Sequence, residues 1–180
     1  MNHIVRGAAL AALLVVAGTS GVQAQQAEEP RNFFSFGAGA TVPVGDFKEE
    51  AKTGFMTGLG FGAGITGNLF VLGTGFYGRN GVNEEGHADD YYKLLGGTVN
   101  LGLSGSGESV RPYGYAGVGM QRVEEKGEDH THGAENELFG NAAVGLSFGR
   151  GNARFWIQSG AVFGREHSYV PLSAGVSIWF

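Results

Sequence analysis

The chain of 180 residues contains no cysteine and only 4 prolines. The absence of cysteine excludes disulfides, thiolate metal sites and cysteine nucleophiles. Positive charge is also scarce, because 12 basic residues stand against 17 acidic ones and the formal net charge is −5. Proteins that bind a phosphate backbone need an excess of basic residues, so we expect no nucleic-acid partner. Glycine is abundant, with 34 residues, but it shows no three-residue period of the collagen kind.

Long apolar runs are confined to the N-terminus. Arg6 precedes an unbroken apolar run at residues 8–17, and Val22-Gln23-Ala24 places small residues at positions −3 and −1 of a cleavage site. This run is shorter than the roughly 20 residues that a membrane-spanning helix needs. We therefore predict a cleaved secretory signal peptide at 1–24, a polar lead-in at 25–32 and one domain at 33–180.

Beyond residue 32, apolar residues recur at every second position, which is the period of a β-strand with two different faces. In the last such stretch Val170, Leu172 and Ala174 share one face, and Tyr169, Pro171 and Ser173 share the other. Eight stretches show this period, and the sequence predicts strands at 33–44, 55–65, 69–77, 94–103, 112–121, 138–148, 155–164 and 169–180.

Charged residues are absent from all eight stretches and fall in the connections or the lead-in. A soluble barrel would carry charges on its outward face. Here the second face consists of Gly, Ser, Thr, Asn and Gln, which suits an interior, so the apolar face is expected to contact lipid. In lipid, strands can span only as a closed barrel without edges. The predicted fold is therefore all-β, an eight-stranded antiparallel up-and-down transmembrane β-barrel.

The connections between the predicted strands alternate between long and short. The long ones, at 45–54, 78–93 and 122–137, contain most of the acidic residues, and Gly67-Asn68 forms a credible tight turn. The last connection, 165–168, is unexpectedly short for a long-loop position. We therefore expect one strongly acidic mouth, with either a low rim at 165–168 or a different strand boundary there.

Glycines occupy many positions that are predicted to face inward: Gly37, Gly39, Gly58, Gly60, Gly62, Gly64, Gly73 and Gly75. One interpretation is that they make room for large inward neighbours, namely Arg154, Trp156, Trp179 and the pair Tyr113 and Tyr115. The other is a hollow lumen that holds a small apolar ligand. An eight-stranded barrel is just wide enough for side chains to fill, so the sequence leaves both open.

Two motifs resemble those of known membrane barrels. The terminal Trp179-Phe180, preceded by alternating apolar residues, resembles the signal that the bacterial barrel-assembly machinery reads. Pro43-Val44-Gly45-Asp46-Phe47, followed by Gly54, resembles a common first-loop pattern. Residues 33–180 thus resemble the small outer-membrane barrels of Gram-negative bacteria grouped around the OmpA transmembrane domain and OmpX.

The resemblance implies an outer-membrane location, a periplasmic N-terminus and no single activity. It also implies three partners: outer-membrane lipid, lipopolysaccharide and the assembly machinery. The assembly signal would consist of Val176, Ile178 and Phe180.

Carboxylates and histidines gather in two long connections. They form candidate sites for a divalent cation, whose ligands would be Glu84, His87, Asp89, Asp129, His130 and His132. A solvated acidic surface is the alternative, and loose cation bridging to lipopolysaccharide phosphates is a third interpretation. No cofactor is expected.

Glu166-His167-Ser168 contains the residue types of an acyl-transfer site. The histidine and serine are adjacent, however, so in a strand they point to opposite faces. We therefore predict a non-enzymatic protein with a structural or surface-interaction role. An adhesin, a small-ligand or lipid-binding barrel, a narrow pore and a lipid A-modifying enzyme remain alternatives.

Overall fold

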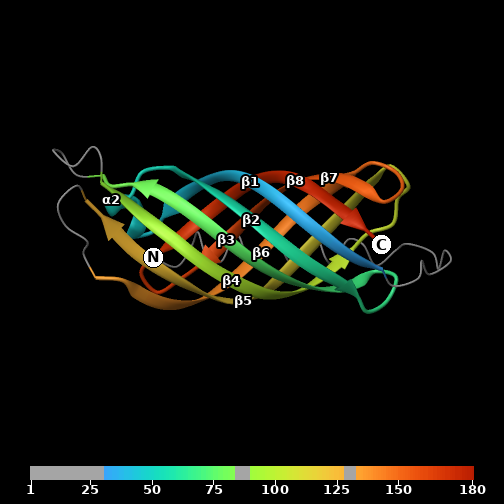
Figure 1. The fold of residues 1–180 in the computed structure, drawn as a ribbon, viewed down its shortest axis with the longest axis horizontal. Coiled ribbons are helices and arrows are strands. Elements are labelled where there is room, and N and C mark those ends of the chain that lie inside the picture. The colour runs from blue at the N-terminus through green and yellow to red at the C-terminus, as the bar shows by residue number, and fades with distance from the viewer. Residues whose placement is uncertain (1–30, 84–89, 128–132) are drawn as a thin grey trace.

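Eight antiparallel strands form a closed barrel in chain order, from β1 next to β2 round to β8 next to β1 (Figure 1). The structure is a computed structural model that describes residues 31–83, 90–127 and 133–180. Its elements are β1 Asn32–Val44, α2 Phe47–Glu50, β2 Gly54–Gly64, β3 Leu69–Gly81, β4 Tyr91–Ser104, β5 Val110–Lys126, β6 Glu135–Phe148, β7 Ala153–Phe163 and β8 Ser168–Trp179. The predicted eight-stranded barrel is confirmed. The predicted signal peptide lies outside the described residues.

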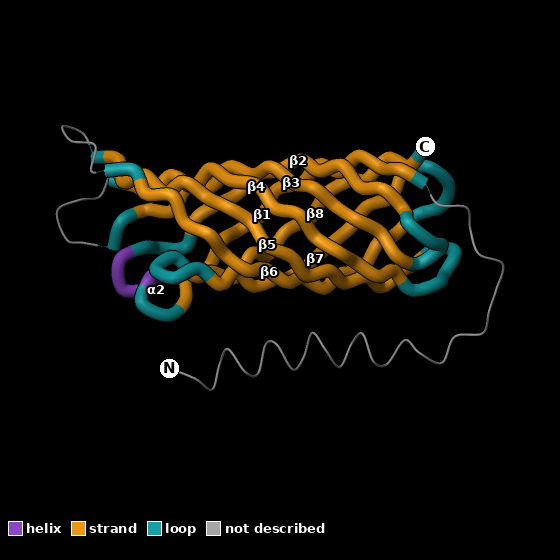
Figure 2. The backbone as a smooth tube through the Cα atoms, turned by 90° about the horizontal axis from the view of Figure 1, so that it is seen from below, coloured by secondary structure: helices purple, strands orange, loops and turns teal. Residues whose placement is uncertain are grey.

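The two ends of the barrel differ in their connections. At the end that we call the turn end, strands are joined through 65–68, 105–109 and 149–152, and the amide of Asn32 pairs with the carbonyl of Phe180. The opposite end, the loop end, carries the connections 45–53, 82–90, 127–134 and 164–167. Figure 2 shows α2 at the loop end, away from the C-terminus. The predicted alternation of connections is therefore observed.

Among the described residues, helical structure is too short to offer a membrane-spanning helix.

The loop end is uneven in height. Strand β5 has 17 residues, whereas β7 and β8, joined by the short connection 164–167, have 11 and 12. The sheet formed by β3 to β6 therefore rises beyond the rest of the rim. Of the two explanations left open for the short last connection, the low rim is the one observed.

Side chains alternate between the two faces as predicted. Large apolar residues point outward and are strongly exposed, for example Leu138 at 79%, Val118 at 69% and Leu59 at 68%. On β8, Leu172 and Ile178 face outward while Tyr169 is buried. A face of this composition needs an apolar surrounding, because monomers in water rarely expose large apolar patches.

The strands are longer than predicted, chiefly at the loop end. Residues such as Arg79, Lys93, Arg122 and Glu124 lie within β3 to β5, although the sequence placed them in connections. Arg154 likewise lies within β7. Apolar residues alternate only along the part of each strand that has an apolar surrounding. The strands themselves continue to pair through their backbones beyond that part.

The interior is built from large side chains packed over glycines of neighbouring strands. A Cβ on Gly62 would lie 2.1 Å from the Phe33 ring, and one on Gly102 would lie 2.2 Å from the Phe70 ring. Cβ atoms on both Gly37 and Gly175 would come within 2.4 Å of the indole of one tryptophan, Trp156. These glycines make room for inward aromatic rings, as one of the two interpretations predicted.

The predicted orientation of Gly73 and Gly75 is wrong. Both share the outward face of β3 with Leu69 and Tyr77, and a Cβ on either would meet nothing closer than 4.0 Å. The reason is that β3 is apolar on both faces, so periodicity alone did not decide which face turns inward. The rings of Phe70 and Phe76 take the interior because glycines on β4 leave room for them.

Candidate functional site

The loop end of the lumen is closed by an apolar cluster that we call the plug. Its core residues are Phe47, Ala51, Val82, Tyr92, Leu94, Val123, Phe139, Val162 and Tyr169, all at most 9% exposed. Phe47 enters the plug from α2, because Gly45 adopts a left-handed φ of 65° that turns the chain back over the barrel mouth. The Phe47 ring meets the Tyr92 ring edge-on at 5.5 Å. The first-loop motif thus has a structural role, which is to close the barrel.

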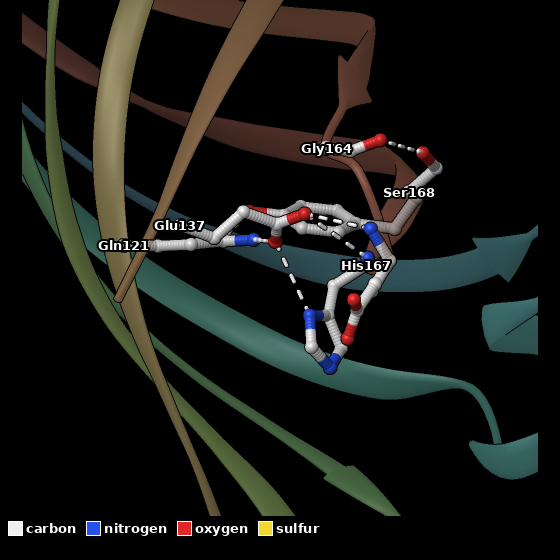
Figure 3. A network of polar contacts seen from close by, with 7 residues as sticks. Gln121, Glu137, Gly164, His167 and Ser168 are labelled. Carbon is white, nitrogen blue, oxygen red and sulfur yellow. Dashed lines mark hydrogen bonds and ion pairs between the residues drawn. The ribbon is translucent and has the colours of Figure 1, made fainter. Parts of the chain in front are cut away.

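A polar network lies beside the plug (Figure 3). The Glu137 carboxylate accepts hydrogen bonds from the Gln121 side-chain amide at 3.0 Å and from the backbone N–H of Glu166 at 2.7 Å. Its Oε2 lies 3.1 Å from Nδ1 of His167, and the Tyr169 hydroxyl donates to Gln121 at 3.2 Å. The network ties β5 and β6 to the short β7–β8 connection.

Hydrogen bonding determines the charge state of Glu137. Burial raises its pKa, but the backbone N–H of Glu166, the amide of Gln121 and the imidazole of His167 together lower the pKa below its ordinary value. The carboxylate is therefore ionised at neutral pH and holds the connection down over the plug.

The residue types of an acyl-transfer site are present, but the structure does not bring them together. The His167 ring is buried against Glu137 and the Phe47 ring, whereas the Ser168 hydroxyl donates to the carbonyl oxygen of Gly164 at 3.2 Å. Glu166 contributes its backbone N–H to the network rather than its carboxylate. The predicted opposite orientation of His167 and Ser168 is observed, since His167 is buried and Ser168 begins the outward face of β8.

Below the plug, the lumen contains a cavity of about 190 Å³. Its walls include the rings of Phe33, Phe70, Phe76 and Trp156. Aromatic rings therefore cover many of the glycines, as the first interpretation predicted, and a hollow still remains in the lumen.

Near the cavity, Tyr113 donates to the Gln158 side-chain oxygen at 3.0 Å, and the Gln158 amide donates to the Tyr115 hydroxyl at 3.0 Å. This chain joins β5 to β7 through the lumen. The predicted inward orientation of the tyrosine pair is thus observed.

On the outward face, five charged residues gather where the apolar surface of β3 to β5 ends. We call this set the cation patch: Arg79, Lys93, Arg122, Glu124 and Lys126. The strand register places Arg79 beside Lys93, and Lys93 beside Glu124. The patch carries four positive charges and one negative charge.

Glu124 holds the cation patch together. Its carboxylate accepts from Nε of Arg122 at 2.8 Å and lies 3.4 Å and 3.5 Å from the ammonium groups of Lys93 and Lys126. The Arg122 hydrogen bond is the main cause that lowers the pKa of Glu124. The Arg79 guanidinium lies 3.6 Å from the centre of the Tyr91 ring, a cation–π contact. These interactions hold the four basic side chains of the patch close together on the outward face.

The predicted cation ligands lie outside the described residues: Glu84, His87, Asp89, Asp129, His130 and His132. Within 31–83, 90–127 and 133–180, no three histidine or carboxylate side chains are grouped so that they could hold a metal ion.

The predicted assembly signal lies at the end of the last strand, with Phe180 directly after β8. Val176, Ile178 and Phe180 all face outward, and Phe180 stacks on Phe34 of β1 at 5.6 Å between ring centres. These residues therefore line the seam where the barrel closes.

Sequence reasoning missed Glu137 and the cation patch as candidate sites. Glu137 shares the parity of Phe139 and Asn141, so continuing the strand by one residue would have placed its carboxylate in the lumen. The cation patch depends on pairing between three strands, which no local pattern reports.

Comparison with protein-family models and with curated protein sequences finds no match. Solved structures do match. Neisserial surface protein A has a TM-score of 0.66 at 16% identity over 87% of this chain and 100% of its own. The N-terminal barrel of Pseudomonas aeruginosa OprF has a TM-score of 0.59 at 16% identity, over 86% of this chain and 100% of its own. Ail, the attachment invasion locus protein of Yersinia pestis, has a TM-score of 0.55 at 16% identity, over 85% of this chain and 99% of its own. The chain thus has the fold of the small outer-membrane barrels, and the predicted resemblance is confirmed at that level.

Proposed function

We propose that the chain is an integral protein of a bacterial outer membrane with a structural and surface-interaction role and no enzymatic activity. The loop end faces the cell exterior and the turn end faces the periplasm. The observation that carries this proposal is the cation patch, which lies at the edge of an outward surface that is otherwise apolar and free of charge.

The apolar surface fits the hydrocarbon layer. Outward residues of β4 from Leu95 to Leu103 include Val99 and Leu101, at 63% and 55% exposure. In lipid, acyl chains surround these side chains. The sheet is closed, so no strand edge leaves backbone N–H or carbonyl groups without hydrogen bonds.

The cation patch fits the phosphates of lipopolysaccharide. On the outward face of β4, Leu95 is the last apolar side chain before the loop end and Lys93 follows it. On the paired strand β5, Met120 is likewise followed by Arg122. Each basic group next to an anionic lipid surface contributes about 1 kcal/mol of attraction. The excess of three positive charges thus suits the clustered phosphates of an outer-leaflet glycolipid. Ail, which has the same fold, has been crystallised with the heparin analogue sucrose octasulfate, a polyanion.

The arrangement around Ser168 supports the absence of acyl-transfer activity. A serine nucleophile needs an adjacent base, but the Ser168 hydroxyl lies on the outward face and donates to the carbonyl oxygen of Gly164, whereas the His167 ring is buried. We expect the mass spectrum of lipid A to be unchanged after incubation with the protein in vesicles. Loss of an acyl chain that depends on Ser168 would contradict the proposal.

Retention of lipid A tests the role of the cation patch. The mature chain is folded in phosphatidylcholine nanodiscs that contain diphosphoryl lipid A, and co-purified lipid A is counted by native mass spectrometry. We expect the variant Lys93→Gln/Arg122→Gln/Lys126→Gln to retain several-fold less lipid A than the natural chain.

The control variant Lys48→Gln/Lys52→Gln/Arg165→Gln removes the same number of charges from the loop end but leaves the cation patch intact. It should retain as much lipid A as the natural chain. Equal losses in the two variants would mean that total charge, and not the patch, determines retention.

The acidic connections are proposed to make the surface contacts. Two of them, 82–90 and 127–134, join the raised strands β3 to β6. We propose loose divalent-cation binding by Glu84, His87, Asp89, Asp129, His130 and His132. Isothermal titration with Ca²⁺, Mg²⁺ and Zn²⁺ tests it, and no binding below millimolar concentration would refute it. Deleting 127–134 should abolish adhesion to a partner surface while the barrel still folds.

The last strand is proposed to carry the assembly signal for the barrel-assembly machinery, read from Val176, Ile178 and Phe180. Deleting Phe180 should reduce the amount of folded protein in the outer membrane of cells. Refolding of the same variant in vesicles, where no machinery is present, should be much less affected.

A further inference from the structure

The lumen cavity is large enough for a guest molecule. Its volume is about 190 Å³, and an engineered apolar cavity of about 150 Å³ accommodates benzene. The walls are mainly aromatic and aliphatic, with Phe33, Phe70, Leu72, Phe76 and Trp156 among them. An apolar group the size of one ring or a short alkyl chain therefore fits.

The plug blocks access from the loop end. Leu94 is fully buried, and Phe47 and Tyr169 are each only 1% exposed. The Thr41 hydroxyl donates to the side chain of Asn80 at 2.9 Å, so polar residues around the plug are also tightly packed. A guest therefore enters from the turn end.

At the turn end the cavity adjoins a second hollow of about 320 Å³. Phe70, Ser104, Arg111, Arg154 and Trp179 line both hollows, so the two hollows meet at these side chains, and we call the pair the passage. The deep part of the passage is apolar and its mouth is polar.

The mouth is rich in arginine. Arg31, Arg111, Arg150 and Arg154 line it, and Glu108 is the acidic residue of its wall. Arg154 is only 4% exposed, and its guanidinium donates to the Ser147 hydroxyl at 3.1 Å and to the Glu108 carbonyl oxygen at 3.4 Å. These contacts hold the side chain in place at the boundary between the two hollows. An arginine cluster at the mouth of an apolar cavity favours a planar anion, since the guanidinium fork matches a carboxylate.

We propose that the lumen binds a small amphipathic carboxylate, with its apolar body in the aromatic cavity and its carboxylate at Arg111 and Arg154. The guest enters through the turn end, which the proposed orientation places on the periplasmic side. A hydroxyl on the guest would also satisfy Asn141 Oδ1, a buried oxygen that borders the cavity and has no hydrogen-bond partner within the described part of the chain.

The two tryptophans of the chain, Trp156 and Trp179, both line the cavity and report on its occupancy. The mature chain in phosphatidylcholine nanodiscs is titrated with 8-bromooctanoate, whose bromine quenches tryptophan fluorescence on contact. Bromooctanol is the matched neutral probe. We expect saturable quenching by the acid at concentrations about tenfold lower than by the alcohol, because charge-assisted hydrogen bonds strengthen binding.

Substitutions identify the anion site. Arg111→Gln should weaken bromooctanoate binding about tenfold and leave bromooctanol unchanged. Arg154→Gln should weaken bromooctanoate binding in the same way. If this variant does not fold, Arg111→Gln alone decides the test, because Arg111 is less buried. Arg165→Gln, the same change in the connection between β7 and β8 at the loop end, is the control and should bind like the natural chain.

Three results would overturn the proposal: equal binding of acid and alcohol, equal effects of Arg111→Gln and Arg165→Gln, or displacement of the probe by inorganic phosphate alone. Displacement by octyl phosphate as well as octanoate would support it and broaden the class to amphipathic anions. These outcomes are independent of lipid A retention, so the proposed function can fail without this inference failing.

Discussion

A charge placed on the outward face tests which solvent surrounds the barrel. Val99 and Leu103 lie on the same face of β4, Val99 in the middle of the apolar surface and Leu103 near the turn end. We compare Val99→Arg with Leu103→Arg, so that the strand, the face and the new side chain are the same and only the depth differs.

The magnitude follows from that depth. The two positions are four residues apart, which is about 10 Å along the bilayer normal for a strand that rises about 3.4 Å per residue and tilts about 40°. Arginine at the bilayer midplane costs about 2–4 kcal/mol, falling to about 0–1 kcal/mol near the interface. A difference of about 2 kcal/mol changes the folded-to-unfolded ratio about thirtyfold.

A water-facing surface would not make Val99→Arg the less stable of the two variants. Val99 is 63% exposed and Leu103 is 41% exposed, so in water Val99 would tolerate arginine at least as well. The assay is equilibrium unfolding in urea with the protein in phosphatidylcholine vesicles, followed by the emission of Trp156 and Trp179 inside the barrel. If Leu103→Arg destabilised the protein as much as Val99→Arg, the assignment of this face to lipid would be refuted.

Three further predictions concern the interior. Gly175→Ala should destabilise the barrel by about 1–3 kcal/mol in the same assay, because its Cβ would lie 2.1 Å from a carbonyl oxygen of β1, whereas Gly73→Ala should be nearly neutral. Equal effects would contradict the packing described for the lumen. Phe47→Ala should lower the free energy of unfolding by about 3–5 kcal/mol, because the plug loses a buried ring, and should expose the β1–β2 connection to proteases. Lys48→Ala, at an exposed neighbouring position, is the control. If Phe47→Ala stayed resistant to proteases, the plug would not depend on this ring. Because the pKa of Glu137 is lowered on folding, its ionised form stabilises the protein above the ordinary carboxyl pKa, and this stability is lost as pH falls below about 4. The acid-induced loss of stability should be smaller in Glu137→Gln, and an unchanged acid profile would contradict the role given to this carboxylate.

The strands and, apart from β3, their faces could be predicted because both depend on nearest neighbours in the sequence. Alternation between Val170 and Pro171, or between Leu59 and Gly60, follows directly from the pleat of a strand in contact with two different solvents. The absence of charge then indicated which solvent lies outside.

Features that depend on pairing between strands could not be predicted. Gly73 was assigned to the wrong face because Phe70 and Phe76 turn inward only where β4 offers glycine beneath them. The cation patch requires Lys93 and Glu124, which are distant in sequence, to lie side by side. Val82 occupies a connection, yet it is only 4% exposed because it bridges to Ala51 in the plug.

The line along which β1 meets β8 has a consequence for how the ring closes. Its middle pairs Gly37 with Gly175 and Ala38 with Ala174, so hardly any side chain spans it apart from the indole of Trp156 above. The barrel closes only when β1 pairs with β8. In the middle of this seam the two strands are joined mainly by backbone N–H and carbonyl groups. Closure of the barrel there therefore depends on backbone hydrogen bonds more than on side-chain packing.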